Sequence, residues 1–293
     1  MTFFVDDEIA SQPACWRQAA ALAPGLAQEL QAPGERVGFV GCGTSWFMAQ
    51  IIASWREAAG HGESDAFSAS EVPDRPYDRI VAITRSGTTT EVVELLDTLR
   101  GLVPTTVVLG DQSTAAARLA DQVVDLSFAD EQSVVQTRFA TSTLALFRAA
   151  YGTDVEPLAA AAEDAVAAPL SEGLAEAEQA TFLGRGWTIG LAHEAALKFR
   201  ETSSSWAESY PAMDYRHGPI AIAAPGRLVW MFGEPPAGLA EQVGATGATF
   251  LTSDLDPMVH LVLAQRVAVE RAKRLGVDPD APQNLTRSIV LPG

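Results

Sequence analysis

The sequence is poor in cysteine, in basic residues and in long apolar runs. Two cysteines in 293 residues, Cys15 and Cys42, provide neither a disulfide framework nor a metal-ligand cluster. The 20 basic residues are outnumbered by 37 acidic ones, and the net charge of -17 repels nucleic acid and anionic membranes. No apolar run reaches the roughly 18 residues of a membrane span, and the acidic start does not suit a signal peptide. We therefore expect a cytoplasmic protein without nucleic-acid or membrane partners.

Short apolar runs alternate with helical segments along the chain. Runs of this kind lie at 36–41, 79–84, 104–110, 181–184 and 226–232. Buried strands that alternate with amphipathic helices are typical of parallel sheets covered on both faces. The length and the 47% hydrophobic content allow one large core or two modest ones, and we expect two domains.

The two halves of the chain resemble each other. In the segment "TFLGRGWTIGLAHEAALKF", Gly184 and Gly186 repeat the spacing and setting of Gly41 and Gly43 in "GFVGCGTSWFMAQIIASW". An internal duplication explains this similarity, although chance resemblance between α/β segments also produces it.

These patterns divide the chain into five parts. They predict an N-terminal helical segment, a first domain, an alanine-rich connecting helix, a second domain and a C-terminal tail, at residues 1–34, 35–152, 153–179, 180–283 and 284–293.

Hydroxyl side chains stand where the first two strands lead into helices. Thr44 and Ser45 occupy positions where a dinucleotide-binding turn has glycine, and Ser86 and Thr89 begin the helix after the next strand. Helix N-termini at the carboxyl ends of parallel strands attract anions, and a phosphate monoester accommodates hydroxyl donors. Each cluster alone is also explained by helix capping. Two clusters at one sheet edge favour phosphate binding, which we expect only in the first half.

A charged stripe is predicted on the helix that follows Gly186. At about 100° per residue, Glu194, Lys198 and Glu201 fall within roughly 60° of one another. Two interpretations remain open from the spacing: a solvated face with a Glu-Lys pair, or a closed crevice in which one glutamate acts as a general base.

Six segments together resemble the sugar isomerase (SIS) family. They are "GCGTS", "TRSGTTTE", "EQSVVQTRFATS", "LGRGWTIGLAHEAALKFRE", "AESYPAMDYRHGPIAI" and "DPDAPQNLTRS". Their order is similar to that of the isomerase domain of the glutamine:fructose-6-phosphate amidotransferases, over about residues 36 to 290. The resemblance implies two tandem SIS domains, each a doubly wound five-stranded parallel sheet in a three-layer α/β/α sandwich. It also implies a homodimer with shared active sites and a tail that closes the site.

The resemblance also implies a role for individual residues. The implied phosphate ligands are Thr44, Ser45, Thr84, Ser86 and Thr89. The implied sugar contacts are Val134, Gln136 and Arg287. The implied catalytic residues are Glu201, which moves the proton between C1 and C2, His217, which assists ring opening across the dimer, and Lys198 and Glu194. No metal or organic cofactor is implied.

Two departures from the family pattern limit the expected activity. Arg287 stands where the family has a lysine that is proposed to form a Schiff base, and a guanidinium is not a nucleophile. The second departure is that the sequence shows no glutaminase segment, so we expect no glutamine-dependent synthase activity. Arg85 also stands where the related synthases have a glutamine, and its backbone is still able to contribute to the phosphate site.

The expected function is therefore an isomerase or isomerising deaminase of an aminosugar 6-phosphate, such as glucosamine 6-phosphate. A deglycase of sugar-amine 6-phosphate adducts is an alternative within the same family. A phosphosugar sensor without catalysis is another, although a sensor requires neither Glu201 nor His217.

Overall fold

The computed structural model describes residues 3–291, which form two compact units, each with its own parallel sheet. The five-stranded unit comprises residues 11–132, 136–159 and 286–291. The four-stranded unit comprises residues 3–10, 133–135 and 160–285. Residues 1, 2, 292 and 293, at the outer ends of the predicted N-terminal segment and tail, lie outside the described residues. The predicted α/β class with two parallel sheets is confirmed.

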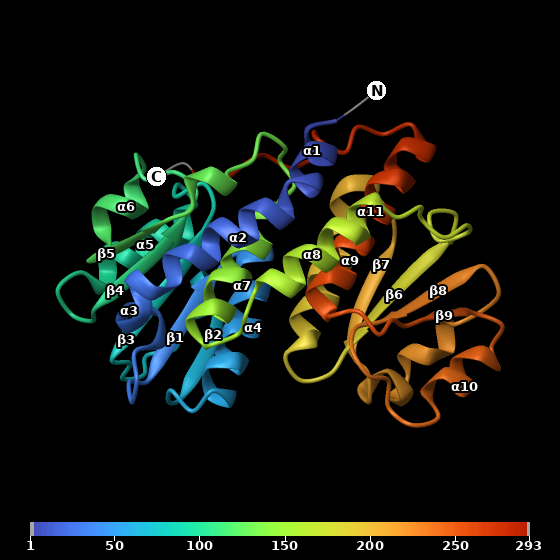
Figure 1. Cartoon of the computed structure of the whole chain (residues 1–293), viewed down its shortest axis with the longest axis horizontal. Coiled ribbons are helices and arrows are strands. Elements are labelled where there is room, and N and C mark those ends of the chain that lie inside the picture. Colours follow the sequence, from blue (N-terminus) through green and yellow to red (C-terminus); the bar gives the residue numbers. More distant parts are fainter. Residues whose placement is uncertain (1–2, 292–293) are drawn as a thin grey trace. The chain divides into compact units, whose positions relative to one another are not determined.

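The sheet of the five-stranded unit has the order β2-β1-β3-β4-β5, and all its pairings are parallel (Figure 1). Its strands are β1 Val37–Gly41, β2 Ser64–Ser68, β3 Arg79–Thr84, β4 Thr105–Leu109 and β5 Gln122–Asp125. Its helices are α2 Gln12–Leu22, η1 Ala23–Leu26, α3 Ala27–Gln31, α4 Thr44–Ala58, η2 Ala69–Glu71, α5 Thr90–Leu99, α6 Ala115–Leu119, η3 Ser127–Ala129 and α7 Arg138–Ala150.

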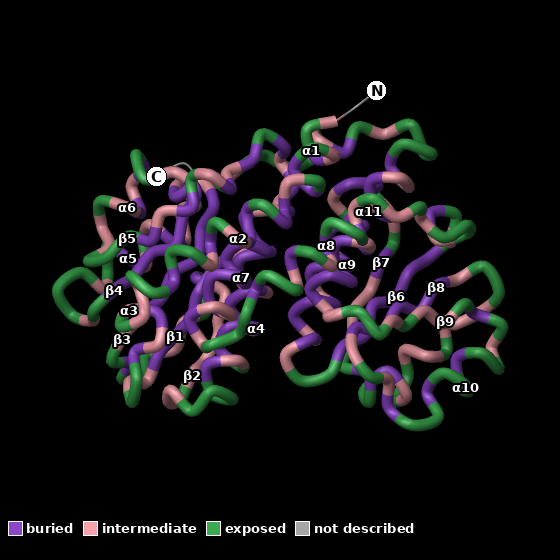
Figure 2. Tube along the Cα trace, in the orientation of Figure 1, coloured by how far each residue is buried: buried purple, intermediate pink, exposed green. Residues whose placement is uncertain are grey.

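Helices cover both faces of this sheet because side chains of each interior strand alternate between the faces. On one face, Val40 of β1 packs in a cluster with Val92 and Leu96 of α5. On the other face, Phe39 meets Phe147 of α7 edge-on, with ring centroids 5.9 Å apart. The interior strands are buried, as the purple trace through β1 in Figure 2 shows. The unit is the predicted three-layer sandwich.

The sheet of the four-stranded unit has the order β7-β6-β8-β9 and is also parallel (Figure 1). Its strands are β6 Gln179–Gly184, β7 Ala207–Pro211, β8 Arg227–Met231 and β9 Thr249–Leu251. Its helices are α1 Phe4–Ala10, α9 Thr188–Ser203, η4 Asp214–His217, η5 Pro219–Ile222, α10 Leu239–Gly244 and α11 Pro257–Leu275.

The core of the four-stranded unit also lies on two faces of its sheet. Phe182 of β6 meets Phe199 of α9, with ring centroids 4.9 Å apart. The next residue, Leu183, packs on the opposite face with Leu239 and Val243 of α10.

The prediction of five strands in the second sheet is wrong, because the described residues form four. After β9 the chain enters the long helix α11, and the segment that follows it contains Pro279 and Pro282 but no apolar run that would make a buried strand.

The predicted connecting helix is also shorter than expected. Helix α8 covers Glu156–Ala167, whereas the prediction extended over residues 153–179. Pro169 explains the early end, since proline disfavours helical backbone in the residue before it and removes an N–H.

The repeated glycines have the same structural role in both units. A Cβ atom on Gly41 would lie 2.6 Å from the backbone of Ser45, and one on Gly184 would lie 2.3 Å from the backbone of Thr188. Glycine at these positions therefore lets α4 and α9 begin directly against β1 and β6.

Candidate functional site

Two neighbouring strands of the five-stranded unit place the predicted phosphate ligands at one sheet edge. β1 pairs in parallel with β3, so their carboxyl ends lie side by side. Thr44 and Ser45 are the first residues of α4, and Thr84 is the last residue of β3; each is 3% exposed. Ser86 and Thr89 are half-buried in the turn that connects β3 to α5. All five predicted ligands therefore belong to two adjacent strand-to-helix connections.

Helix capping does not explain the hydroxyl of Thr89. Thr89 occupies the N-cap position of α5, and among residues 3–291 its side chain makes no capping hydrogen bond to that helix. The hydroxyl of Thr89 and the N–H of Thr90, the first residue of α5, thus have their partners outside the helix.

The acceptor that these hydroxyls meet is a residue of the C-terminal tail. The Oγ of Ser288 accepts hydrogen bonds from Ser86 Oγ at 3.1 Å and Thr88 Oγ1 at 3.0 Å. It also lies 3.4 Å from Thr89 Oγ1. We call Ser86, Thr88 and Thr89 the hydroxyl cluster. Sequence reasoning identified the cluster but missed Ser288, since a lone serine in a tail carries no signal of its own.

A buried ion pair holds the connection between β3 and α5, which carries predicted phosphate ligands. Arg85, which lies between two predicted ligands, is 2% exposed, and its Nη1 lies 3.4 Å from Oε2 of the fully buried Glu131. The other carboxylate oxygen of Glu131 accepts the hydroxyl of Thr137 at 2.9 Å and the N–H of Arg138 at 2.7 Å. Arg85 and Glu131 therefore fix the loop after β3 against the start of α7, a coupling that the sequence did not reveal.

Arg287 contacts the same region, and its guanidinium is already paired. Its Nη2 donates to both carboxylate oxygens of Asp130, at 2.5 and 2.7 Å, and its Nη1 donates to the carbonyl of Glu131. Arg85 in turn donates to the carbonyl of Arg287 at 3.2 Å. The described contacts of Arg287 thus anchor the tail segment to the five-stranded unit.

The two predicted sugar contacts in the loop before α7 belong to different units. Gln136 of the five-stranded unit is half-buried, and its Oε1 is buried without a hydrogen-bond donor among the described residues. This oxygen is able to accept a hydrogen bond from a sugar hydroxyl. Val134 of the four-stranded unit donates its N–H to the carbonyl of Asp280 at 3.1 Å.

The charged stripe on α9 is buried rather than solvated. The side chains of Glu194 and Lys198 are 0% and 1% exposed, and that of Glu201 is 18% exposed. Lys198 Nζ lies 2.5 Å from Glu201 Oε2 and 3.4 Å from Glu194 Oε1. The ammonium of Lys198 thus lies between two carboxylates, and Glu201 is the member of the cluster that reaches the surface. Burial excludes the interpretation of the stripe as a solvated face.

His217 also belongs to the four-stranded unit. It is the last residue of the short helix η4 and is exposed. His193 is on α9 itself, and its Nδ1 lies 2.8 Å from Ser209 Oγ. His260 is 2% exposed against Trp230, and burial lowers its pKa to about 4. Packing accounts for His193 and His260, which leaves His217 as the exposed histidine of this unit.

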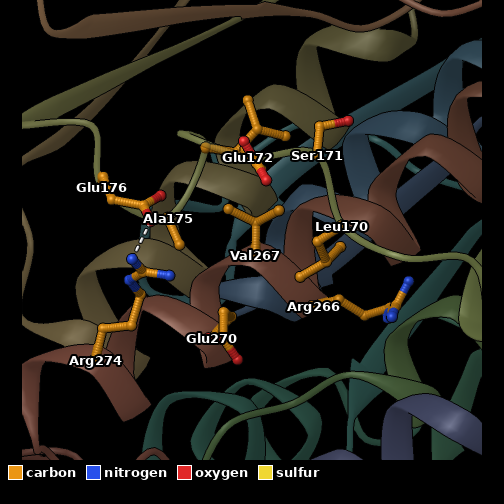
Figure 3. Close-up of a pocket in the computed structure, with 10 residues that line it drawn as sticks. Leu170, Ser171, Glu172, Ala175, Glu176, Arg266, Val267, Glu270 and Arg274 are labelled. Atoms are coloured by element: carbon orange, nitrogen blue, oxygen red, sulfur yellow. Dashed lines mark ion pairs between the residues drawn. The ribbon is translucent and has the colours of Figure 1, made fainter.

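A separate pocket of about 350 Å³ opens on the four-stranded unit beside α11 (Figure 3). It contains none of the predicted site residues. Arg274 pairs there with Glu176, and Arg266 donates to the carbonyls of Ala165 and Ala168. Its arginines are therefore satisfied by the protein, and we do not place the functional site in it.

The part of the chain that the structure describes contains neither a metal-binding cluster nor a membrane-spanning helix. No group of three or more His, Cys, Asp or Glu side chains between residues 3 and 291 is arranged to hold a metal ion. None of the helices in the same range combines the length and apolar character that a membrane span requires.

The known proteins that this chain resembles are enzymes named for sugar 6-phosphates. No protein-family model matches the chain. A glutamine–fructose-6-phosphate aminotransferase (isomerizing) from Xylella fastidiosa is 27% identical over 314 aligned positions, which cover 87% of this chain and 52% of the relative. The chain thus spans about half the length of the curated relatives it matches.

Two crystal structures extend the comparison. A glucosamine-6-phosphate deaminase from Thermotoga maritima is 25% identical with a TM-score of 0.80, covering 98% of this chain and 99% of that chain. The C-terminal domain of glucosamine-fructose-6-phosphate aminotransferase from Francisella tularensis shares the fold, with 22% identity, a TM-score of 0.82 and coverage of 96% and 99%.

Proposed function

Because the chain is homologous over most of its length to the sugar isomerase (SIS) domain of glutamine–fructose-6-phosphate aminotransferases, we propose that it isomerises a sugar 6-phosphate. More specifically, we propose that it deaminates an aminosugar 6-phosphate such as glucosamine 6-phosphate. The likeness to a glucosamine-6-phosphate deaminase along nearly the whole of both chains supports the finer assignment. Two free thiols, Cys15 and Cys42, fit the cytoplasmic location that we propose.

The observation that carries this proposal is the state of Glu201. It is a carboxylate with limited solvent access, held in one orientation by a buried ammonium at 2.5 Å. A general base requires a fixed position and little competing water, and the position and burial of Glu201 support that role. Lys198 and Glu194 act through it as positioning residues.

The phosphate is held by the residues at the ends of β1 and β3. Thr44, Ser45, Thr84, Ser86 and Thr89 supply hydroxyl donors, and the first-turn N–H groups of α4 and α5 supply the dipole. This local site overcomes the repulsion expected from the net charge of -17. Gln136 receives a sugar hydroxyl on its free side-chain oxygen.

The chemistry balances without an external oxidant or reductant. In the open-chain aminosugar, C1 is an aldehyde and C2 bears the amine. Glu201 removes the proton from C2 while the oxygen on C1 takes up a proton, which gives an enolamine. The same carboxyl then returns its proton to C1 as the nitrogen on C2 gives one up. The resulting imine at C2 is hydrolysed by water to the ketose phosphate and ammonia. Arg287 replaces the family lysine and stays protonated, so this route involves no Schiff base with the protein.

We propose that His217 acts in a homodimer, where His217 of the partner subunit assists ring opening. Its exposure leaves it accessible to a partner subunit and supports a role outside its own unit. The test mixes two inactive variants, Glu201→Gln and His217→Asn, under conditions that exchange subunits. Since half of the dimers are then mixed and each contains one intact site, roughly a quarter of wild-type activity should return. If activity remains absent after verified exchange, both residues act within one chain.

The activity test incubates the purified chain with glucosamine 6-phosphate, galactosamine 6-phosphate and a fructosamine-type 6-phosphate, while ammonia and ketose are measured. Ammonia with ketose identifies a deaminase, and ketose interconversion without ammonia identifies a simple isomerase. Amine release from the adduct alone identifies a deglycase, and a thermal shift without turnover identifies a sensor.

The decisive variant is Glu201→Gln, which keeps the size of the side chain and removes the base. We expect turnover to fall by about 10²–10⁴ while substrate binding is retained. Glu241→Gln, on an exposed face of α10, is the matched control and should behave as wild type. Normal turnover by Glu201→Gln would remove the basis of the proposal.

A further inference from the structure

The tail segment, residues 286–291, provides acceptors to the same donors that the phosphate site requires. Ser288 Oγ accepts from the hydroxyl cluster at 3.0 and 3.1 Å. The carbonyl of Ile289 accepts the N–H of Thr90, the first residue of α5, at 3.1 Å. Both oxygens therefore lie at the entrance of α5, where the oxygens of a phosphate would accept the same hydrogen bonds.

Further contacts hold the tail segment in this place. Thr90 Oγ1 accepts the N–H of Leu291 at 2.9 Å, so the tail and the start of α5 are bonded in both directions. On the other side of Ser288, Arg287 forms the two-bonded contact with Asp130. The contact between tail and loop is therefore a set of several hydrogen bonds rather than one chance approach.

We propose that the tail segment is an internal occupant of the phosphate site and that a sugar phosphate must displace Ser288 and Ile289 to bind. This inference rests on the phosphate site of the proposed function. A hydroxyl proton donated to Ser288 is not available to a phosphate oxygen at the same time. Bonds to a charged phosphate are roughly twice as strong as those to a neutral hydroxyl or carbonyl, so phosphate wins the exchange. The apparent affinity for phosphate is then the intrinsic affinity multiplied by the fraction of molecules in which the tail is already displaced.

The test measures binding of inorganic phosphate by titration calorimetry. Ser288→Ala removes the acceptor in the centre of the hydroxyl cluster and should tighten phosphate binding at least about fivefold, since each of the two neutral hydrogen bonds that it removes is worth about that factor. A chain that ends at Leu285 should bind phosphate at least tenfold more tightly than the full chain. Val290→Ala, at a tail position that is 67% exposed, is the matched control and should leave affinity unchanged.

Amide hydrogen exchange supplies a readout that a purely structural tail would not change. Saturating phosphate should speed exchange of the Leu291 N–H, which loses Thr90 Oγ1 as its acceptor. The Thr90 N–H should stay protected, because phosphate replaces the Ile289 carbonyl as its acceptor.

The possible outcomes separate this inference from the function on which it rests. Equal phosphate affinity in the full chain, Ser288→Ala and the shortened chain refutes the tail as occupant and leaves the phosphate site intact. Weaker binding by Ser288→Ala also refutes it and makes Ser288 a phosphate ligand instead. If neither the full nor the shortened chain binds phosphate or a sugar phosphate, the phosphate site and the inference both fail.

Discussion

Replacing Lys198 by methionine tests whether the charges on α9 form one buried unit. The variant would leave Glu194 with no exposed surface and without its ammonium at 3.4 Å, beside the second carboxylate of Glu201. At an effective dielectric constant of about 20, a charge pair at this distance is worth about 5 kcal/mol. Removing one partner of a buried pair typically costs about 3–5 kcal/mol, a large part of the about 5–15 kcal/mol that stabilises a domain. We therefore expect a loss of about 3–5 kcal/mol at pH 8.

The assay is urea unfolding of the full chain, followed at pH 8 and pH 5. The loss should shrink at pH 5, because a buried carboxylate without an ammonium takes up a proton. The double variant Glu194→Gln/Lys198→Met should recover part of the stability, since the fully buried charge is gone and only Glu201, which reaches the surface, is left without its ammonium. Lys273→Met, which breaks a half-exposed pair with Asp6 at 2.8 Å, is the control and should cost at most about 1 kcal/mol. A loss below about 1 kcal/mol for Lys198→Met at pH 8 would refute the reasoning.

Three other predictions concern the phosphate site, a pH effect and the glycine turn. Ser45→Ala should weaken sugar-phosphate binding at least about tenfold in calorimetry because a charge-assisted hydrogen bond is lost, with Thr98→Ala at the far end of α5 as the unchanged control. Burial lowers the pKa of His260 from 6.5 to about 4, so the unfolded chain binds a proton that the folded chain does not, and stability is lost as the pH falls from 6.5 to 4. This group accounts for about 3 kcal/mol of the free energy of unfolding between these pH values. In urea unfolding, His260→Gln should reduce the change of that free energy with pH by the same amount. Gly41→Ala should lower stability by about 1–3 kcal/mol in the same unfolding assay, because its Cβ would lie 2.6 Å from the backbone of Ser45; a stability equal to wild type would show that α4 shifts freely.

The sequence revealed the interior strands and missed those at the edges. β1, β3, β4, β6 and β8 are covered on both faces and therefore appear as apolar runs. The four edge strands are short and partly exposed, and their mixed composition resembles that of loops. The expected fifth strand of the second sheet came from the family resemblance rather than from an apolar run in the sequence, and the described residues form four strands.

For the candidate site, the sequence determined which residue types follow each strand and which share one side of α9. Strand ends that lead into hydroxyls are visible in the chain order, and the spacing of Glu194, Lys198 and Glu201 follows from the helical period. These features are local, so no tertiary contact is needed to recognise them.

Tertiary structure decided which of these groups are buried and what they contact. Periodicity does not reveal whether a charged stripe is solvated or buried, whereas the 0% exposure of Glu194 shows that this one is buried. Neither the pairing of Arg85 with Glu131 nor the position of Ser288 on the hydroxyl cluster could be read from the sequence. Each joins segments far apart in the chain, and such contacts depend on how the backbone folds back on itself rather than on the local pattern of residues.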